Sequence, residues 1–412
     1  MKGGIIVAFK KVSAKNKQGY KWECVKDGPI DPATGKRNQI RRRADTKKAA
    51  EDAVDEVVRR LMNGIDEKEA KRMTFEEGAA SWMDVYRRSG KKPSTVDRMM
   101  ADIKFLCRFY GKAPIARISH KNHQDMLNEL DNQGYALKTI ITAHTTAGMI
   151  FKHAIKNKWR LDNPTKDAVI PRKIMTVEEL ENRSIEEKYL KVEELEEFLR
   201  AAIEFGEDGD PEAFYLLAFS GMRPGELLAL KRPDFRFLER LLRISKTLYM
   251  PAAEKEYQLL PPKTASSFRE FTIDLKVCLM LQSYIERRQE FFKRNPPVHD
   301  GGFIFCSDNG YPIYLARFTR RLNRLLKRTS IKKRVTPHIF RHTFISLLAE
   351  ANVPLQTIMK RVGHDDAKTT LKIYTHVTSK MQIDADQKIS EMYSDLLDIP
   401  FNNDFAENVI KK

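Results

Sequence analysis

Cysteine is scarce in this sequence, and long runs of apolar residues are absent. The four cysteines lie far apart and form no CxxC pair: Cys24, Cys107, Cys278 and Cys306. This spacing argues against a disulfide framework or a cysteine-based zinc site, so we expect a protein of the reducing cytoplasm. The longest apolar run near the start, Ile5–Phe9, is too short for a signal peptide or a membrane span, so no membrane partner is expected.

Acidic residues are also in deficit. The chain has 74 lysine and arginine residues against 56 aspartate and glutamate residues, which leaves a formal net charge of +18. A surplus of this size indicates a polyanionic partner, most often nucleic acid, although a merely solvated basic surface is the alternative. Hydrophobic residues at 42% and charged residues at 32% are typical of a globular protein. At roughly 150 residues per domain, the length predicts about three domains.

The first predicted domain, residues 1–64, is small and basic. Its residue pattern predicts three strands: Gly4–Val12, Gly19–Val25 and Gln39–Ala44. A turn is predicted between Gly28 and Gly35, and Thr46 is predicted to be the N-cap of a helix that runs to about Met62. The first 62 residues hold 16 basic and 8 acidic side chains, a net charge of 16 − 8 = +8. Three strands and one helix with this charge indicate a small DNA-binding module.

The second predicted domain, residues 74–170, has an all-helical pattern. Thr74 and Glu77 have the spacing of a capping box, and Pro93 opens a helix with one apolar face. Two further helices are predicted: Lys121–Asp131 and Leu137–Lys158. We interpret the methionine and aromatic residues of these helices as a core and not as a cofactor site.

The third predicted domain, residues 189–412, follows a charged linker at residues 171–188. It opens with an amphipathic helix from about Val192 and is predicted to end in a tail with a helix near Met381–Leu397. A β-hairpin is predicted from strands over Leu241–Ser245 and Arg269–Leu275, the second of which alternates apolar and polar residues. The whole chain is therefore predicted to be a multidomain, mainly α protein with small β elements.

Three short clusters in the third domain carry candidate chemistry. Ser220-Gly-Met-Arg223-Pro-Gly-Glu226 places an arginine at a turn between two helices. His338-Ile-Phe-Arg341-His342-Thr343 lies near the start of another helix, and Gly363-His364 is followed ten residues later by Tyr374. Taken singly, a surface arginine and a packing tyrosine would explain them.

A metal site is the alternative reading of the second cluster. His338 and His342 have the i, i+4 spacing of ligands on one helical face. However, Arg341 between them would repel a cation, and no third ligand lies at a familiar spacing. We therefore expect no metal and no other cofactor.

Together the clusters resemble the boxes of the tyrosine recombinase (phage integrase) family. All six functional positions of the family are filled in order: Arg223, Lys263, His338, Arg341, His364 and Tyr374. Lys263 stands in a Pro-Pro-Lys-Thr context before the second strand, whereas Lys246, in a Lys-Thr pair on the first strand, is the alternative lysine. Ile339 and Val362 depart from the residues common in the family, at positions without chemistry.

The resemblance implies a recombinase that cuts and rejoins DNA through a 3′-phosphotyrosine, without metal or ATP. Tyr374 would be the nucleophile. Arg223 and Arg341 would bind the non-bridging phosphate oxygens, where their fixed positive charge stabilises the transition state. His338 and His364 would donate or relay protons, and Lys263 would protonate the leaving 5′-oxygen.

The resemblance extends upstream. Residues 74–170 look like the family's core-binding domain, and residues 1–64 look like the arm-binding domain of integrases from phages and conjugative transposons. The implied partners are double-stranded DNA with core and arm attachment sites, a homotetramer in the synapse, an excisionase and a host DNA-bending protein, in a bacterial cytoplasm. A chromosome-dimer-resolving recombinase and a non-catalytic DNA-binding regulator are the alternatives.

Four further arginines form a candidate DNA-contacting face or a merely solvated one: Arg317, Arg320, Arg321 and Arg324.

Overall fold

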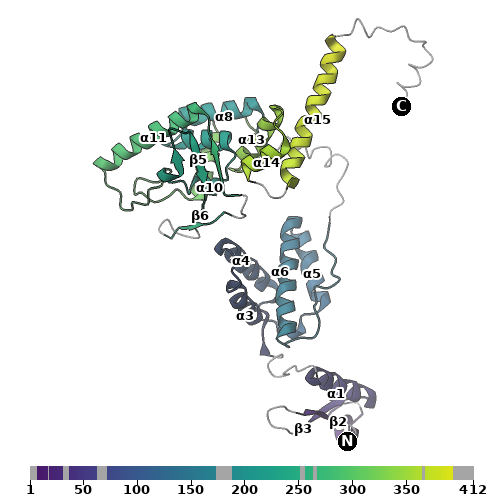
Figure 1. Ribbon diagram of the computed structural model, residues 1–412. Coiled ribbons are helices and arrows are strands. Elements are labelled where there is room, and N and C mark those ends of the chain that lie inside the picture. The colour runs from purple at the N-terminus through teal and green to yellow at the C-terminus, as the bar shows by residue number, and fades with distance from the viewer. Residues whose placement is uncertain are drawn as a thin grey trace, which may run out of the picture. The chain divides into compact units, whose positions relative to one another are not determined.

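The structure is a computed structural model (Figure 1). It describes residues 7–16, 18–30, 37–62, 72–172, 188–250, 256–262, 267–363 and 367–392. Contacts divide the chain into two compact units, Met1–Ile174 and Met175–Lys412, and each is described by itself. Helices predominate in both, with small antiparallel sheets, which confirms the predicted fold class. Most of the predicted linker, residues 173–187, lies outside the described residues.

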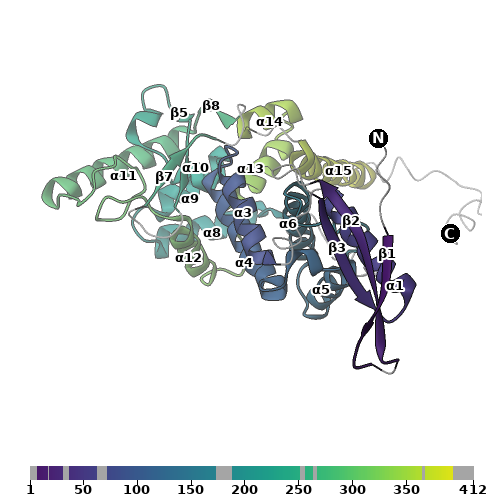
Figure 2. The ribbon, with the colours of Figure 1, turned by 90° about the horizontal axis from the view of Figure 1, so that it is seen from below.

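The chain begins with a three-stranded antiparallel sheet covered on one face by a helix. The elements are β1 (Val7–Ser13), β2 (Tyr20–Ile30), β3 (Arg37–Ala44) and α1 (Lys47–Met62), and the strands lie side by side in the order β1-β2-β3 (Figure 2). Cys24, Ile40 and Val54 are buried between sheet and helix. The Thr46 hydroxyl accepts a hydrogen bond from the Ala49 amide at 3.1 Å, as predicted for an N-cap.

One predicted boundary in this sheet is wrong. β2 does not end near Val25 but continues to Ile30, into the first residues of the predicted turn, whose remaining residues 31–35 lie outside the described ones. The pairing of β2 with β3 shifts register between Asp27 and Ile30. A bulge of this kind lets a strand continue past residues that usually mark a turn.

The described residues from 72 to 172 form four α-helices, as predicted. The elements are α3 (Phe75–Arg87), α4 (Pro93–Tyr110), the 3-10 turn η1 (Ile115–Arg117), α5 (His120–Asn132) and α6 (Leu137–Lys156). The Thr74–Glu77 capping box is formed, and Pro93 occupies the first turn of α4. Met99, Met126 and Phe151 are buried in the core, which confirms their interpretation as packing residues. The boundaries at residues 64 and 74 stay a prediction, consistent with separate hydrophobic clusters in the sheet and in the helices.

The second unit places its helices around one large core. Its helices are α8 (Val192–Phe205), α9 (Asp210–Ser220), α10 (Pro224–Leu227), α11 (Leu275–Arg294), α12 (Leu315–Leu326), α13 (Ile339–Glu350), α14 (Leu355–Val362) and α15 (Ala367–Met392). Phe198, Phe214, Phe318 and Phe340 are almost fully buried and contact one another. Figures 1 and 2 show α13, α14 and α15 together at one end of this unit and α11 at the other.

The two strands that the sequence predicts as a hairpin do pair, and further short strands accompany them in the described residues. β5 (Leu241–Ile244) pairs antiparallel with β8 (Arg269–Thr272), and β4 (Phe235–Arg236), which follows the short turn η3 (Arg232–Asp234), pairs with β5. The connection between β5 and β8 contains another pair, β6 (Thr247–Tyr249) and β7 (Gln258–Leu260). β8 ends before the predicted Leu275 because the Asp274 side chain caps α11.

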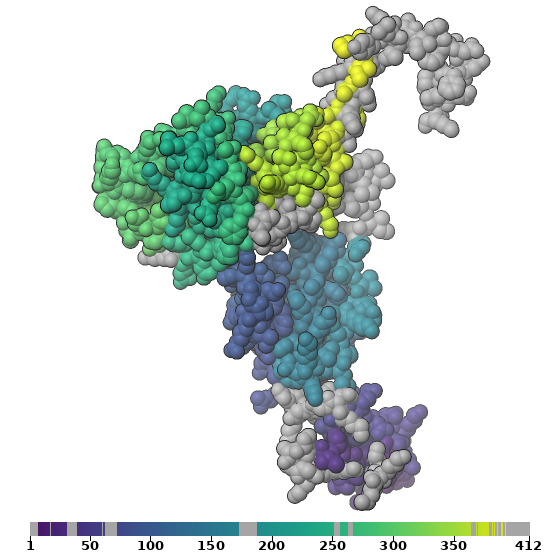
Figure 3. Space-filling model, viewed as in Figure 1, coloured from purple at the N-terminus to yellow at the C-terminus, as the bar shows by residue number. Residues whose placement is uncertain are grey.

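The C-terminal helices share a small hydrophobic cluster with the segment that precedes α8. The cluster contains Tyr189, Phe344, Ile345, Val362 and Ile373, and the yellow-green atoms of α13 and α14 gather in one part of the surface in Figure 3. α15 is a single helix, so the helix predicted near Met381–Leu397 is the continuation of the helix that carries Tyr374, as far as Met392. Among the described residues, no helix combines the length and the apolarity that a membrane crossing requires.

Candidate active site

Arg223 lies at a sharp turn between α9 and α10. Gly221 follows α9 with φ +63°, and a Cβ atom there would lie 2.4 Å from the Phe344 ring. Only glycine therefore fits this turn without a shift of its neighbours. Arg223 is the N-cap residue of α10, and Pro224 opens the helix. The turn fixes the arginine backbone against the core, and its side chain is about one-quarter exposed.

A buried carboxylate holds the Arg223 side chain. Glu226 is 2% exposed, and its Oε1 accepts from Arg223 Nη1 at 2.8 Å while its Oε2 accepts from the Arg223 amide at 2.8 Å. Arg269, the first residue of β8, donates to Oε2 from Nη2 at 2.8 Å. Burial alone would raise the pKa of Glu226, but the hydrogen bond and charge of Arg269, with those of Arg223, lower it.

Arg341 brings the second cluster to the first. It lies in the first turn of α13, is 3% exposed, and donates from Nη1 to the Gly221 carbonyl oxygen at 2.7 Å. Burial, followed by the charge of Arg223, lowers the pKa of Arg341 to about 9. The guanidinium is still charged at neutral pH. The positive charge of Arg223 makes the charged form of Arg341 less favourable, so an anion bound between the two guanidiniums would stabilise both.

His338 is the N-cap residue of α13 and lies beside these arginines. Desolvation by the surrounding protein, then His342 and the charges of Arg341 and Arg223, hold the pKa of His338 below its ordinary value, although the residue is exposed at the surface. The imidazole is therefore neutral at pH 7. A neutral ring has one nitrogen that donates and one that accepts, so it can pass a proton.

The segment before α8 is bound directly to α13. The Leu190 amide donates to the Thr343 hydroxyl at 2.9 Å, and that hydroxyl donates to the Ile339 carbonyl at 3.0 Å. His342 Nδ1 lies 3.1 Å from the Lys188 carbonyl oxygen. His342 thus holds the backbone at the start of this unit.

A hydrogen bond joins the third cluster to the first. Arg223 Nη2 donates to the Gly363 carbonyl oxygen at 3.1 Å, immediately before His364. Gly363 ends α14 with φ +68°. Tyr374 lies in the second turn of α15, half-buried against the hydrophobic cluster that contains Val362 and Ile373. His364 itself lies outside the described residues.

The two candidate lysines have different situations. Lys263 lies outside the described residues. Lys246 follows β5, and its ammonium group contacts both carboxylate oxygens of Asp234 at 2.5 Å. The Asp234 side chain also accepts from the Lys231 amide, so this ion pair anchors the start of β4. Lys246 therefore has a structural partner.

Comparison with known proteins decides the family. The sequence model of the phage integrase family matches residues 188–381. The chain is 32% identical to a probable integrase of prophage ps2 from Lactococcus lactis over 363 residues, which cover 85% of this chain and 92% of that protein. The chain belongs to the phage integrase family. It is a tyrosine recombinase, an enzyme of DNA strand exchange, and its relatives are integrases that support a role in integration and excision.

Solved structures of integrases have the same fold. The Tn1549 transposon integrase in complex with transposon right end DNA matches with a TM-score of 0.60 at 23% identity, over 76% of this chain and 100% of that one. A lambda integrase tetramer bound to a Holliday junction matches with a TM-score of 0.54 at 18% identity, over 85% and 91% of the two chains. At these identities the likeness extends to the fold.

Two side chains of this integrase that support Arg223 were not predicted. Glu226 belongs to the first cluster, and Arg269 follows Lys263 by six residues. The sequence analysis predicts no role for either residue. The sequence position of Glu226 could have indicated its role. It lies three residues after an N-cap, where an acidic side chain reaches back to the cap. The pairing with Arg269 connects residues 43 positions apart, which a single sequence does not reveal.

The basic face of α12 is less available for DNA than its sequence indicates. Arg321 donates to Asp210 at 2.9 Å and lies 2.8 Å from Glu207, and Arg324 pairs with the same two acids. Asp210 is fully buried at the start of α9. These arginines therefore attach α12 to α9. Arg320 donates to the Tyr314 hydroxyl and stacks on its ring, also within the protein.

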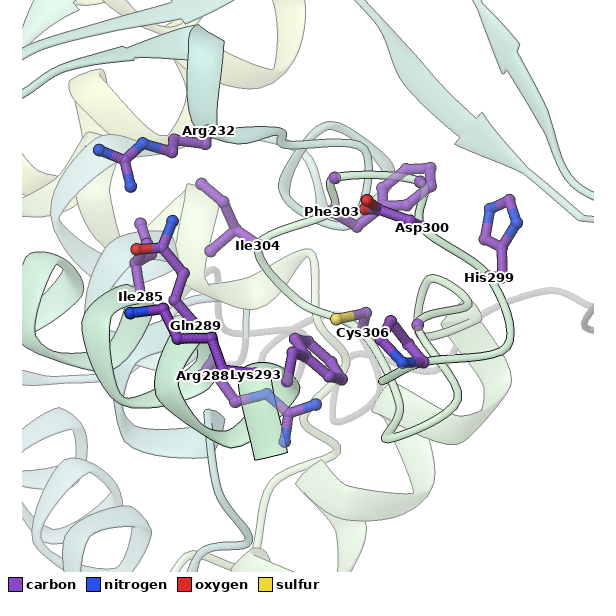
Figure 4. Close-up of a pocket in the computed structure, with 15 residues that line it drawn as sticks. Arg232, Ile285, Arg288, Gln289, Lys293, His299, Asp300, Phe303, Ile304 and Cys306 are labelled. Carbon is purple, nitrogen blue, oxygen red and sulfur yellow. The ribbon is translucent and has the colours of Figure 1, made fainter. Parts of the chain in front are cut away.

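The described part of the chain groups no metal ligands at the candidate site, and one cavity in it is lined by residues other than the six predicted ones. Within the described ranges, no three histidine, cysteine, aspartate or glutamate side chains are grouped as metal ligands. A cavity of about 580 Å³ lies between α11 and the loop at residues 297–310, where Phe303, Arg288 and Cys306 line it (Figure 4). None of the six predicted residues lines it. A duplex substrate contacts a protein surface and needs no enclosed pocket.

Proposed function

We propose that this integrase joins a mobile element to a bacterial chromosome, and excises it, by cutting and rejoining DNA through a phosphotyrosine at Tyr374. One observation carries the proposal. Hydrogen bonds from Arg341 to Gly221 and from Arg223 to Gly363 join three clusters that are far apart in sequence. The Arg223 guanidinium therefore contacts Gly363, and the Arg341 guanidinium contacts the turn that carries Arg223.

In the proposed reaction the Tyr374 oxygen attacks the scissile phosphorus, and the 5′-oxygen of the next nucleotide leaves. The new tyrosine–phosphate ester keeps the energy of the broken phosphodiester, so the free 5′-hydroxyl of another strand can reverse the step without ATP. Arg223 and Arg341 bind the non-bridging oxygens. His338 and His364 relay protons at the phosphate, and no metal is required, because the two guanidiniums supply the positive charge.

Lys263 is proposed to protonate the leaving 5′-oxygen. The ion pair of Lys246 with Asp234 supports this assignment over the alternative, because a lysine that makes two short contacts to a carboxylate is held away from other partners. The role requires a side chain that reaches the DNA from the connection between β7 and β8.

The N-terminal module is proposed to bind arm-type DNA sites with the sheet face opposite α1. Side chains alternate along strands, and Cys24 and Ile40 face α1, so the neighbouring positions face outward. Four cations share the outward face: Lys10, Lys21, Arg41 and Arg43. The hydrogen bond and charge of Arg43, then the charges of Arg41 and Lys10, lower the pKa of Glu23, the acid among them.

The helices at residues 74–170 are proposed to form the core-binding domain, which would grip the duplex opposite the catalytic domain at residues 189–412. A homotetramer in the synapse is proposed by analogy with the lambda integrase tetramer. An excisionase and a host DNA-bending protein are proposed to set the direction of the reaction, in the cytoplasm at the nucleoid.

A recombination assay tests this function against its alternatives. Two plasmids would carry the junction DNA of the element that encodes the chain and the matching chromosomal site, and the purified protein would be added in excess EDTA. We expect recombinant plasmid in EDTA. A magnesium requirement would overturn the metal-free mechanism, binding without products would favour a regulator, and recombination of chromosome-dimer sites alone would favour a resolving enzyme.

A further inference from the structure

The carboxylate that holds Arg223 is shared between two arginines. Glu226 Oε1 accepts from Arg223 Nη1 at 2.8 Å and from Arg269 Nη1 at 3.4 Å. Glu226 Oε2 accepts from the Arg223 amide and from Arg269 Nη2, both at 2.8 Å. The side chain of Arg269 is 6% exposed, whereas that of Arg223 is 26% exposed. Arg269 therefore lies behind the carboxylate, and Arg223 lies between the carboxylate and solvent.

A buried serine links the two arginines. Arg223 Nη1 donates to the Ser267 hydroxyl at 3.2 Å, and Arg269 Nη1 donates to the Ser267 carbonyl oxygen at 3.1 Å. Ser267 is fully buried, and Arg269 begins β8, which pairs with β5. The sheet thus fixes the position of Arg269, and Arg269 fixes that of Glu226.

We propose that Arg269 is a positioning residue. Its positive charge neutralises the Glu226 carboxylate. This carboxylate can then orient Arg223 without cancelling the positive charge that Arg223 presents to the scissile phosphate. The proposal rests on the proposed function of Arg223. Together Arg223, Glu226 and Arg269 carry a net charge of +1, to which Arg341 adds another. Without Arg269, the pair of Arg223 and Glu226 has no net charge. The scissile phosphate would then be bound by one net positive charge instead of two. Arg269 would have this effect without contacting the DNA.

The same arrangement makes a prediction about pH. The charged groups that face Glu226 are Arg223 of α10, Arg269 of β8, and Arg341 and His338 at the start of α13. Burial raises the pKa of Glu226, and Arg269 is the largest of the opposing effects. In Arg269→Met the carboxyl would take up a proton more readily, and each protonation would release Arg223 from the carboxylate.

The test is a double-mutant cycle measured as covalent protein–DNA adduct on a nicked junction duplex. Arg269→Met should lower the rate of adduct formation about 10- to 100-fold, by analogy with the loss of outer partners that orient metal-binding side chains. In the Glu226→Gln background the same substitution should cost less than about 3-fold, because no negative charge is left to neutralise. Arg269→Lys, which keeps the charge, should retain more activity than Arg269→Met.

Two further measurements separate positioning from a general loss of structure. The rate of Arg269→Met, relative to the unsubstituted chain, should rise as the pH falls from 8 to 6. Arg288→Met is the matched control, since Arg288 is also mostly buried and ion-paired, with Asp308 at 2.8 Å, away from the site. It should match Arg269→Met in thermal stability and DNA binding without the loss of rate.

An equal loss in both Glu226 backgrounds, with no pH effect, would overturn the proposal. Absence of adduct with the unsubstituted chain would instead overturn the proposed function.

Discussion

Lys263 and Lys246 are the two candidates for the general acid, and we propose that Lys263 has this role. Lys246 is ion-paired with Asp234, and Lys263 stands in the Pro-Lys-Thr context. Lys263→Ala should lose cleavage on an ordinary nicked duplex and recover it on a 5′-bridging phosphorothiolate, because a thiolate leaves without a proton. Lys246→Ala is the control and should cleave both substrates alike. Rescue of Lys246→Ala alone would transfer the role to it.

At the scale of elements, α4, α5 and α6 are joined by a buried polar chain. The Tyr110 hydroxyl lies 2.8 Å from His123 Nδ1, and His123 Nε2 lies 3.0 Å from His144 Nδ1. His123 is fully buried, and burial, with the nearby His144 and His120, lowers its pKa to about 3. The helices therefore fold around a neutral imidazole.

This buried polar chain predicts that the bundle loses stability in acid. The unfolded state binds a proton on His123 below its ordinary pKa, while the folded state does not, so stability falls as the pH falls from about 6.5 toward 3. The loss between pH 7 and pH 5 should be about 2 kcal/mol. Urea unfolding of the full chain, followed by tryptophan fluorescence, would measure it. His123→Gln should remove this part of the pH dependence, and an unchanged dependence would refute the assignment.

The helices were largely predictable from the sequence, whereas part of the strand pairing was not. Amphipathic periods and caps predicted α1, α3 to α6 and α8 because those signals are local, as at Thr74 and Pro93. The order of the six family positions predicted the site residues, whose roles stay predictions. The β6–β7 pair and the continuation of β2 were missed because strand pairing depends on distant partners. The same limit hid the pairing of Glu226 with Arg269.

At the scale of the whole molecule, the N-terminal module is proposed to add affinity for arm DNA and nothing to the chemistry. Deletion of Met1–Asn63 removes about +8 of the +18 net charge and none of the six site residues. The truncated chain should keep core-site cleavage. Each phosphate that the module no longer neutralises should reduce the slope of log K against log salt by about 0.9, so binding to arm DNA should become less salt-dependent, with no change on core DNA. Equal slopes on arm DNA would mean that the module has another role.

The central claim is that Tyr374 becomes covalently joined to DNA, and peptide mapping tests it most directly. The chain would react with a nicked junction duplex, and the product would be digested with nuclease and trypsin for mass spectrometry. Trypsin cuts after Lys372 and Lys380, which yields a peptide with Tyr374 as its one tyrosine. We predict a 3′-nucleotide on this peptide, and its loss in Tyr374→Phe while DNA binding persists. An adduct on any other residue, or one that survives in Tyr374→Phe, would contradict the account.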